Sequence, residues 1–296
     1  MAGYLPLSLF MPTSDLPLIS PKDIPFATGT VIVDARSGPG AHERYSANHL
    51  NGAVHADLDR HLSQKPTDPA YGGRHPLPEI AAFTKFLGEI GITPSTLVVV
   101  YDDKNGANAA ARFWWMLRAL GHTNVKVVDG GLDAIVRAGK NMTSAKHEPV
   151  STSSYPAKEW QLPMVNIDDV KVAVNNPKSL IIDVREAYRY RGEREPIDLI
   201  AGHIPEAINI PYLQNLTDDG RFLPAKELAS QYKKAIGHRN PSDIIVHCGS
   251  GVTACHTLLA LEQAGISGAG LYVGSWGEWS RRDLPIATEH SSESQD

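Results

Sequence analysis

The chain repeats itself, and this repetition limits its fold more than any other feature of the sequence. Three short segments recur in one order, 146 to 154 residues later: Val31–Arg36 as Ile181–Arg185, His49–Val54 as His203–Ile208, and Leu97–Asp102 as Asp243–Cys248. Two glycines, Gly121 and Gly130, recur 144 residues later as Gly265 and Gly274. Self-similarity of this kind indicates repeated structural units. The sequence therefore predicts two copies of one domain, with loop insertions that shift the offset.

The two copies are separated by a stretch without hydrophobic periodicity. Residues 146–161 read KHEPVSTSSYPAKEWQ, with two prolines and three serines, which is linker composition. We expect a first domain over residues 1–145 and a second over residues 162–288. Residues 289–296 are polar, and we expect them to form a frayed tail.

Each copy alternates short apolar runs with segments of helical spacing. The runs place apolar residues side by side, which is typical of strands buried on both faces: 96–101, 124–128, 180–183, 243–247 and 269–273. The helical patterns cover Ala107–Leu120 and Thr253–Gly265. Strand and helix in alternation predict an α/β fold, in which each domain is a parallel sheet flanked by helices on both faces. Ligands of such sheets bind at the carboxyl ends of the strands.

Composition excludes several classes of protein. The 296 residues carry a net charge of -5, so there is no basic excess with which to bind nucleic acid. Two cysteines are too few for a disulfide scaffold or a four-cysteine zinc site, and no histidine spacing calls for a metal. The N-terminus has no basic region before its apolar residues, and no apolar run reaches membrane-spanning length. We expect a cytoplasmic protein with no membrane partner, metal or cofactor.

The copies differ at one chemically important position. In the second copy the run Ile244–His247 ends at Cys248, and Gly249-Ser250-Gly251-Val252-Thr253 follows before a helix. Glycines let the backbone curl around the sulfur, and the loop amides and the helix N-terminus favour an anion there. We expect the pKa of Cys248 to lie below the usual value, which makes it a thiolate nucleophile. In the first copy the same strand ends at Asp102.

Two chemistries use a cysteine in such a loop. A phosphatase of the His-Cys-x5-Arg type needs an arginine six residues after the cysteine, and that position is Ala254. Sulfur transfer needs no such arginine, because the loop amides stabilise a terminal persulfide anion. The sequence favours sulfur transfer. Cys255 lies inside the following helix, and we expect it to be a core residue.

These motifs resemble the tandem-domain rhodanese family, in its 3-mercaptopyruvate sulfurtransferase branch. The loop Cys248–Thr253 matches that branch, whereas the thiosulfate branch carries Arg-Lys where Gly249-Ser250 stand. Other segments also resemble family signatures: Asp34–Arg36, Arg112–Met116, Asp129–Gly131, Gly202–Pro205 and Gly274–Trp279. The resemblance covers about residues 15 to 287. It implies two tandem rhodanese-like domains, the first inactive with Asp102 at the cysteine position.

The resemblance implies a set of residues that hold the donor. The amides of Gly249, Gly251, Val252 and Thr253 form the anion cradle. The family's first carboxylate-binding arginine falls on Arg189, and arginine suits bidentate recognition of a carboxylate. The family's second arginine follows a Glu-Pro pair, but here Ile197 stands in that place. Arg191 and Arg194 are the alternatives, either of which is also expected to pair with nearby glutamates.

The resemblance also implies a proton relay. His75, in the segment Gly73–Pro78, resembles the histidine that the family brings to the serine of the loop, here Ser250. Asp59 resembles the acid that orients this histidine, and Asp57 is an alternative. A serine, a histidine and an aspartate in series move protons as in a catalytic triad.

In the first copy, Asp102 stands where the second copy has its cysteine, and we expect Asp102 to form a salt bridge across the domain interface.

The resemblance implies a sulfurtransferase that moves a sulfane sulfur through a persulfide on Cys248. The expected donor is 3-mercaptopyruvate, and the expected acceptor is cyanide, a small thiol or a thioredoxin-like protein. Two alternatives stay open. One is thiosulfate:cyanide sulfur transfer, and the other is a non-enzymatic carrier that holds a persulfide delivered by another protein.

Overall fold

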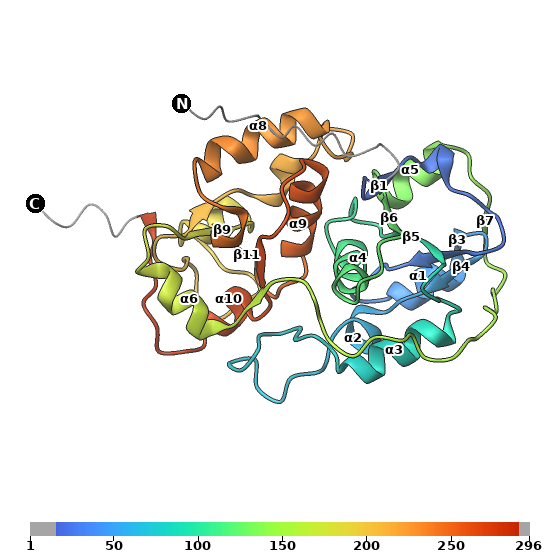
Figure 1. Ribbon diagram of the computed structural model, residues 1–296, viewed down its shortest axis with the longest axis horizontal. Helices are drawn as coiled ribbons and strands as arrows, with labels where there is room; N and C mark the ends of the chain where they lie inside the picture. Colours follow the sequence, from blue (N-terminus) through green and yellow to red (C-terminus); the bar gives the residue numbers. More distant parts are fainter. Residues whose placement is uncertain (1–15, 290–296) are drawn as a thin grey trace, which may run out of the picture.

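Two five-stranded parallel sheets, one from each half of the chain, form the framework of the computed structural model, which describes residues 16–289 (Figure 1). The first sheet has the strand order β1 (Leu18–Ile19), β6 (Val125–Val128), β5 (Leu97–Tyr101), β2 (Thr30–Asp34) and β4 (Ala53–His55). The second has the order β10 (Ile208–Asn209), β9 (Leu180–Asp183), β11 (Ile244–His247), β12 (Gly270–Tyr272) and β8 (Met164–Val165). A short antiparallel pair joins β3 (His49–Leu50) to β7 (Met142–Thr143).

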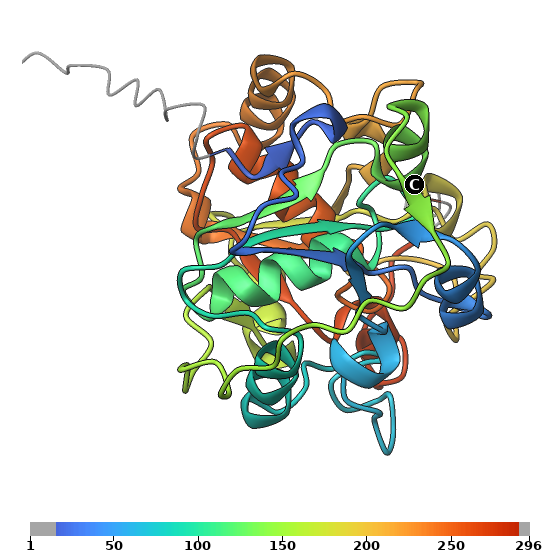
Figure 2. The same ribbon diagram turned by 90° about the vertical axis from the view of Figure 1, so that its right-hand side faces the viewer.

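Helices cover both faces of each sheet (Figure 2). The first half holds α1 (Ala41–Ala47), α2 (Leu58–His61), α3 (Ile80–Glu89), α4 (Ala109–Ala119) and α5 (Gly131–Arg137). The second half holds α6 (Ile167–Val174), α7 (Ala187–Tyr190), α8 (Ala225–Ile236), α9 (Ala254–Gln263) and α10 (Ser275–Trp279). Within residues 16–288 there are also three short 3-10 helices: Pro21–Asp23, Tyr212–Asn215 and Pro241–Asp243.

Burial along the central strands shows why they lack polar alternation. In β5, Val98 and Val100 belong to one apolar cluster, whereas Val99 and Tyr101 belong to another on the opposite face. A strand whose two faces are both covered by helices buries every side chain. The predicted α/β class with helices on both faces is confirmed.

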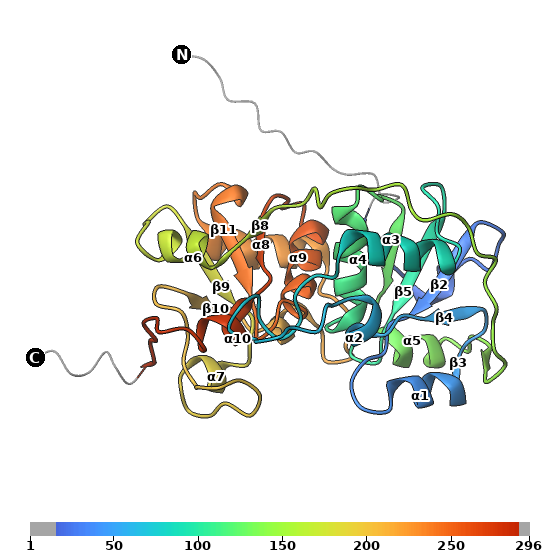
Figure 3. The ribbon, with the colours of Figure 1, turned by 90° about the horizontal axis from the view of Figure 1, so that it is seen from below.

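The largest apolar cluster extends from one domain to the other. It includes Trp114 and Trp115 of α4 together with Leu258 and Leu261 of α9, and these two helices lie against each other between the sheets (Figure 3). At the solvent edge of this contact, Arg118 Nη2 of α4 lies 2.7 Å from Glu262 Oε1 of α9. Apolar burial on this scale makes the two domains one packed unit.

The repeat is visible in detail as a buried ion pair. Arg36 Nη2 lies 2.7 Å from Asp34 Oδ2 and donates to the carbonyl oxygen of Asn48. The second copy repeats this arrangement, because Arg185 pairs with Asp183 and donates to the carbonyl oxygen of Gly202. Each arginine therefore ties the end of a central strand to the residue that precedes a repeated segment, which begins at His49 in the first copy and at His203 in the second.

The predicted elements agree with the observed ones to within about two residues. The expected run 180–183 is β9, and the expected helix 107–120 is α4, which begins at Ala109 and ends at Ala119. Between β7 and β8, residues 144–163 contain neither helix nor strand. Tyr155 in this segment is nonetheless buried. Most of the expected tail lies outside the described residues.

The first prediction concerns the buried ion pair of the first domain. Substitution Asp34→Ala removes the carboxylate and leaves the Arg36 guanidinium buried without its partner. We expect the free energy of unfolding to fall by about 3–5 kcal/mol. Urea unfolding followed by circular dichroism measures this change. Glu148→Ala, which breaks the exposed pair with Lys146, is the control and should leave the midpoint unchanged. Equal midpoints for both variants would contradict the prediction.

Candidate functional site

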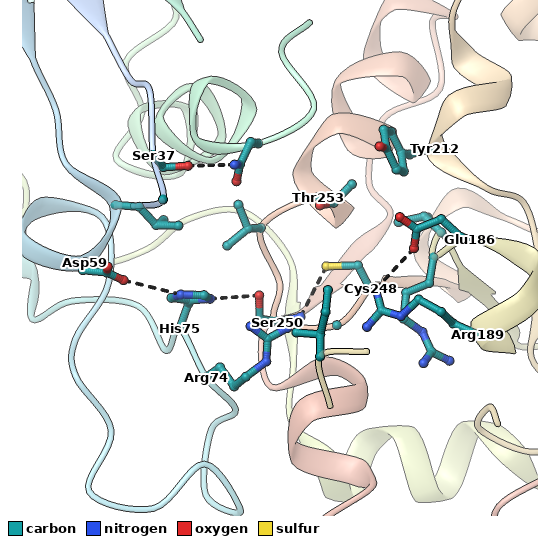
Figure 4. A pocket seen from close by; sticks show the side chains of 18 residues that line it. Ser37, Asp59, Arg74, His75, Glu186, Arg189, Tyr212, Cys248, Ser250 and Thr253 are labelled. Carbon is teal, nitrogen blue, oxygen red and sulfur yellow. Dashed lines mark hydrogen bonds and ion pairs between the residues drawn. The ribbon is translucent and has the colours of Figure 1, made fainter. Parts of the chain in front are cut away.

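A cavity of about 340 Å³ opens between the two domains at the carboxyl ends of β2, β9 and β11 (Figure 4). Residues of both domains line it: Ser37, Asp59, Arg74, His75 and Asn108 from the first, and Arg185, Glu186, Arg189, Ile197, Tyr212, Cys248, Gly249, Ser250, Val252 and Thr253 from the second, among others. The position agrees with the rule that ligands bind at the carboxyl ends of parallel strands.

Cys248 follows the last residue of β11 and lines the floor of this cavity. Its side chain is almost entirely buried, with 3% exposed. The backbone N–H of Ser250 donates to Cys248 Sγ at 3.5 Å. Val252 and Thr253 continue the loop into α9, and both line the cavity.

The two glycines of the loop lie in crowded surroundings. A Cβ on Gly249 would lie 2.9 Å from Arg74 Nη2 and 3.0 Å from Asp198 Oδ2, so those side-chain ends would have to move. Gly251 has a φ of +72°, and a Cβ there would lie 2.5 Å from the carbonyl oxygen of Val273. Gly251 is therefore a position that only glycine fits. The tight curl around Sγ thus depends on residues that carry no side chain.

A serine, a histidine and an aspartate lie in series beside the sulfur (Figure 4). His75 Nδ1 lies 2.9 Å from Ser250 Oγ, and His75 Nε2 lies 3.5 Å from Asp59 Oδ1. The Asp59 side chain is 78% exposed, so its ion pair with His75 is screened by water. Asp57 does not reach His75; its carboxylate accepts from the N–H of Arg60 and caps α2.

His75 is held in its neutral form. Burial, together with the positive charges of Arg74 and Arg112, lowers its pKa to about 4, whereas Asp59 opposes the shift. A neutral imidazole has one free lone pair, so it can accept a proton from a hydroxyl. At neutral pH the ring can therefore accept a hydrogen bond from the Ser250 hydroxyl.

Arg189 lines the cavity opposite the relay and is surrounded by carboxylates. Its guanidinium lies 2.8 Å from Glu195, 3.1 Å from Asp198 and 3.2 Å from Glu186. Burial lowers the pKa of Arg189, but these carboxylates outweigh it and the net shift is upward. Arg189 is therefore a permanently charged group whose orientation is set by these three carboxylates.

The structure does not bring Arg191 or Arg194 to the cavity. Arg191 Nε lies 2.6 Å from Glu193 Oε1. The guanidinium of Arg194 stacks over the ring of Tyr188. Both side chains are engaged on the outside of α7 and the turn after it, and neither lines the cavity. Arg191 thus pairs with a glutamate as expected, whereas the contact of Arg194 is with the ring of Tyr188.

Arg74 is a cavity residue to which sequence reasoning gave no role. Its Nε lies 2.8 Å from Asp198 Oδ1, which also lies 3.4 Å from Arg281 Nη1. Arg74 Nη2 and Arg189 Nη2 lie 2.9 and 3.4 Å from the position that a Cβ on Gly249 would take, and Asp198 Oδ2 lies 3.0 Å from it. Ile197 also lines the cavity, with 55% of its surface exposed. The sequence did place a cation directly before His75. Arg74 comes close to Arg189, however, only through the packing of the two domains.

The structure contradicts the salt bridge expected for Asp102. Among residues 16–289, no basic side chain pairs with Asp102 across the domain interface. Its buried carboxylate accepts from four backbone N–H groups of its own loop at 2.8–3.2 Å: Lys104, Gly106, Asn108 and Ala110. Burial raises the pKa of Asp102, and these N–H groups oppose the rise. The first domain thus keeps the anion-binding loop and fills it with its own side chain.

Within residues 16–289, no group of three or more histidine, cysteine, aspartate or glutamate side chains is arranged to hold a metal ion. No helix in the same range has the length and apolar character needed to cross a membrane.

Comparison with known families and proteins gives the site a context. The profile of the Rhodanese-like domain matches twice, at residues 22–138 and 166–282. The chain is 40% identical over 248 residues to a probable 3-mercaptopyruvate sulfurtransferase of Pseudomonas aeruginosa, and the match covers 82% of this chain and 86% of that protein. It is 38% identical over 252 residues to the putative thiosulfate sulfurtransferase SseB of Mycobacterium tuberculosis, covering 82% and 84%.

Solved structures resemble the whole two-domain arrangement. The 3-mercaptopyruvate sulfurtransferase of Leishmania major superposes with a TM-score of 0.78 at 30% identity, over 90% of this chain and 74% of that one. The 3-mercaptopyruvate sulfurtransferase SseA of Escherichia coli superposes with a TM-score of 0.70 at 30% identity, over 89% of this chain and all of that one.

The second prediction concerns the protonation of His75. Burial and the neighbouring arginines hold its pKa near 4, so its ring stays neutral from about pH 8 down to about pH 5. We expect the His75 ring signals in an NMR titration to stay unchanged over this range. Arg74→Met removes one of the positive charges and should raise the midpoint. A titration of the native protein near the usual value of about 6.5 would contradict the prediction.

Proposed function

The chain belongs to the rhodanese family, and on that premise we propose that it is a sulfurtransferase whose donor is 3-mercaptopyruvate. The observation that carries the proposal is Cys248 at the base of a cavity with Ser250, His75 and two arginines around it. The first domain contributes half of the cavity wall, which supports a small-molecule reaction at this site over a passive carrier role.

The donor is a small α-keto acid, and its carboxylate needs cations. Arg189 and Arg74 line the cavity from opposite domains and both flank Gly249, which supports a shared role in carboxylate binding. In this assignment Arg74 supplies the second cation that the family carries where Ile197 stands here. Asp198 holds both arginines at 2.8 and 3.1 Å and so sets the distance between them.

The chemical step follows from the groups around the sulfur. Cys248 Sγ attacks the thiol sulfur of the donor, an S–S bond forms, and the bond between that sulfur and carbon breaks. The electron pair of the broken bond passes to the carbon as the enolate of pyruvate. The proton that the thiol sulfur gives up ends on this carbon, and Ser250 and neutral His75 lie in position to carry it.

The persulfide on Cys248 then reacts with an acceptor. The backbone N–H of Ser250 is the loop donor nearest to Sγ, and the loop amides stabilise the anionic outer sulfur. Cyanide, a small thiol or a thioredoxin-like protein attacks the outer sulfur, and the thiolate of Cys248 returns. A covalent intermediate of this kind gives ping-pong kinetics.

The third prediction tests the reaction and its donor. We expect kcat/KM for 3-mercaptopyruvate to exceed that for thiosulfate by about tenfold or more, which is about 1.4 kcal/mol of transition-state preference. Steady-state pyruvate release and thiocyanate formation measure the two rates. Cys248→Ser should abolish both, because no thiolate remains, whereas Cys255→Ser should retain activity because Cys255 lies in the core of α9.

Three outcomes would overturn this assignment. Turnover in Cys248→Ser would exclude Cys248 as the nucleophile. A preference for thiosulfate would make the protein a thiosulfate enzyme. Persulfide on Cys248 after incubation with a cysteine desulfurase, without pyruvate release from 3-mercaptopyruvate, would make it a carrier.

The fourth prediction tests the second cation. Arg74→Met removes one of the two guanidinium groups, and we expect KM for 3-mercaptopyruvate to rise by about ten- to a hundredfold. Ile197→Arg, added to that variant, restores an arginine to the cavity wall and should recover most of the loss. Arg137→Gln is the matched control, because Arg137 also reaches from the first domain to the second but binds the carbonyl oxygen of Asp219 away from the cavity. An unchanged KM in Arg74→Met would remove Arg74 from the donor site.

A further inference from the structure

Arg112 of α4 is a cation in the interior of the molecule, with 0% of its surface exposed. Within residues 16–289, no carboxylate forms an ion pair with it. The other wholly buried arginine, Arg185, has Asp183 and Glu195 as partners. A buried guanidinium without a counter-charge is costly, so its retention here calls for a physical explanation.

The partners of Arg112 are three backbone carbonyl oxygens from separate parts of the chain. Its Nη1 donates to Gly251 of the catalytic loop at 3.0 Å. Its Nη2 donates to His75 at 3.1 Å, and Nε and Nη2 reach Leu62 at 3.4 Å. One planar fork thus connects the loop that curls around Cys248 with the residue whose ring faces Ser250.

The counter-charge is found among the sulfur atoms. Burial lowers the pKa of Arg112, and the thiol groups of Cys255 and Cys248, when anionic, are the charges that oppose this shift. Burial raises the pKa of Cys255 to about 12, so Cys255 is neutral at physiological pH. The thiol left to carry a negative charge beside Arg112 is that of Cys248, as a thiolate or as a persulfide.

We propose that Arg112 is a positioning residue for sulfur transfer, an inference that rests on the function proposed above. By binding Gly251 and His75 together it fixes the relay histidine against the catalytic loop. Its positive charge, held against Gly251 of that loop, stabilises the anionic sulfur on Cys248, both before attack and in the persulfide. The first domain therefore contributes a buried cation bonded to the catalytic loop as well as a wall of the cavity.

This role needs an arginine. The Nη1 and Nη2 groups of a guanidinium point in different directions and hold two carbonyl groups at a fixed separation, which a single ammonium group does not do. Arg112→Lys keeps the charge and loses the fork. Arg112→Gln keeps a short hydrogen-bonding group and loses the charge. Together the two variants separate positioning from charge.

The experiment measures single-turnover pyruvate release, KM and the alkylation rate of Cys248 by iodoacetamide at neutral pH. In Arg112→Lys and Arg112→Gln we expect release to slow by about tenfold or more, because a charge-assisted contact is lost, while KM changes by less than about threefold because Arg74 and Arg189 are untouched. In Arg112→Gln, alkylation should slow by a similar factor, because less thiolate is present. Unchanged release and alkylation in both variants would overturn the proposal.

The matched control lies on the same helix. Arg118 of α4 also connects the two domains, through its pair with Glu262, but it lies away from the cavity. Arg118→Gln should leave release and alkylation within about twofold of the native protein. An equal loss in Arg118→Gln and Arg112→Gln would assign the effect to the domain contact as a whole and overturn the positioning role.

A second measurement needs no substitution at Arg112. The native protein is loaded as the persulfide, or converted with methyl methanethiosulfonate to the neutral methyl disulfide, which adds a similar outer sulfur without charge. We expect a higher Tm for the persulfide, because only its outer sulfur complements Arg112. Equal Tm values would overturn the counter-charge role. Failure of the native protein to release pyruvate would instead refute the proposed function, so the two failures are distinguishable.

Discussion

The apolar contact between α4 and α9 is the interaction on which the rest of the structure depends. It buries tryptophans of the first domain against leucines of the second, and it holds the carboxyl ends of the two sheets at one fixed separation. Each domain alone carries only part of the site. His75 and Arg74 reach Ser250 and Asp198 because this contact fixes the distance between the domains. Hydrophobic burial is not directional, yet here it fixes the distances on which the directional hydrogen bonds and ion pairs of the site depend.

The two copies show how one loop architecture is used in two ways. In the first copy the loop after the central strand encloses the carboxylate of Asp102, which takes four backbone N–H groups. In the second copy the corresponding loop curls around Cys248 and opens to the cavity. A carboxylate that is part of the chain satisfies the donors permanently, so the first domain has no vacancy for a ligand there. That domain contributes instead through residues outside its loop: Arg74, His75 and Arg112.

The sequence predicted local features well where the physical cause is local. Buried strands lack polar alternation, and the runs at 180–183 and 243–247 became β9 and β11 with little change. The Gly-Ser-Gly loop after Cys248 required close backbone approach, and Gly249 and Gly251 are both crowded. Asp102 was misjudged as an interface ion because its neighbours in sequence give no sign that their own N–H groups enclose it. Arg74 was overlooked because its partner Asp198 lies 124 residues away.

The sequence by itself determined the two-domain α/β plan and the position of the cysteine loop. It also determined that the loop residues after Cys248 carry no charge. These follow from periodicity and from glycine, which act over a few residues. The tertiary structure alone decided which cations reach the cavity. Arg191 and Arg194 follow Arg189 closely but turn outward to Glu193 and Tyr188. Arg74 reaches the cavity, and Arg112 reaches the catalytic loop, from the other domain, since contacts across an interface depend on how two finished surfaces pack, which no local pattern specifies.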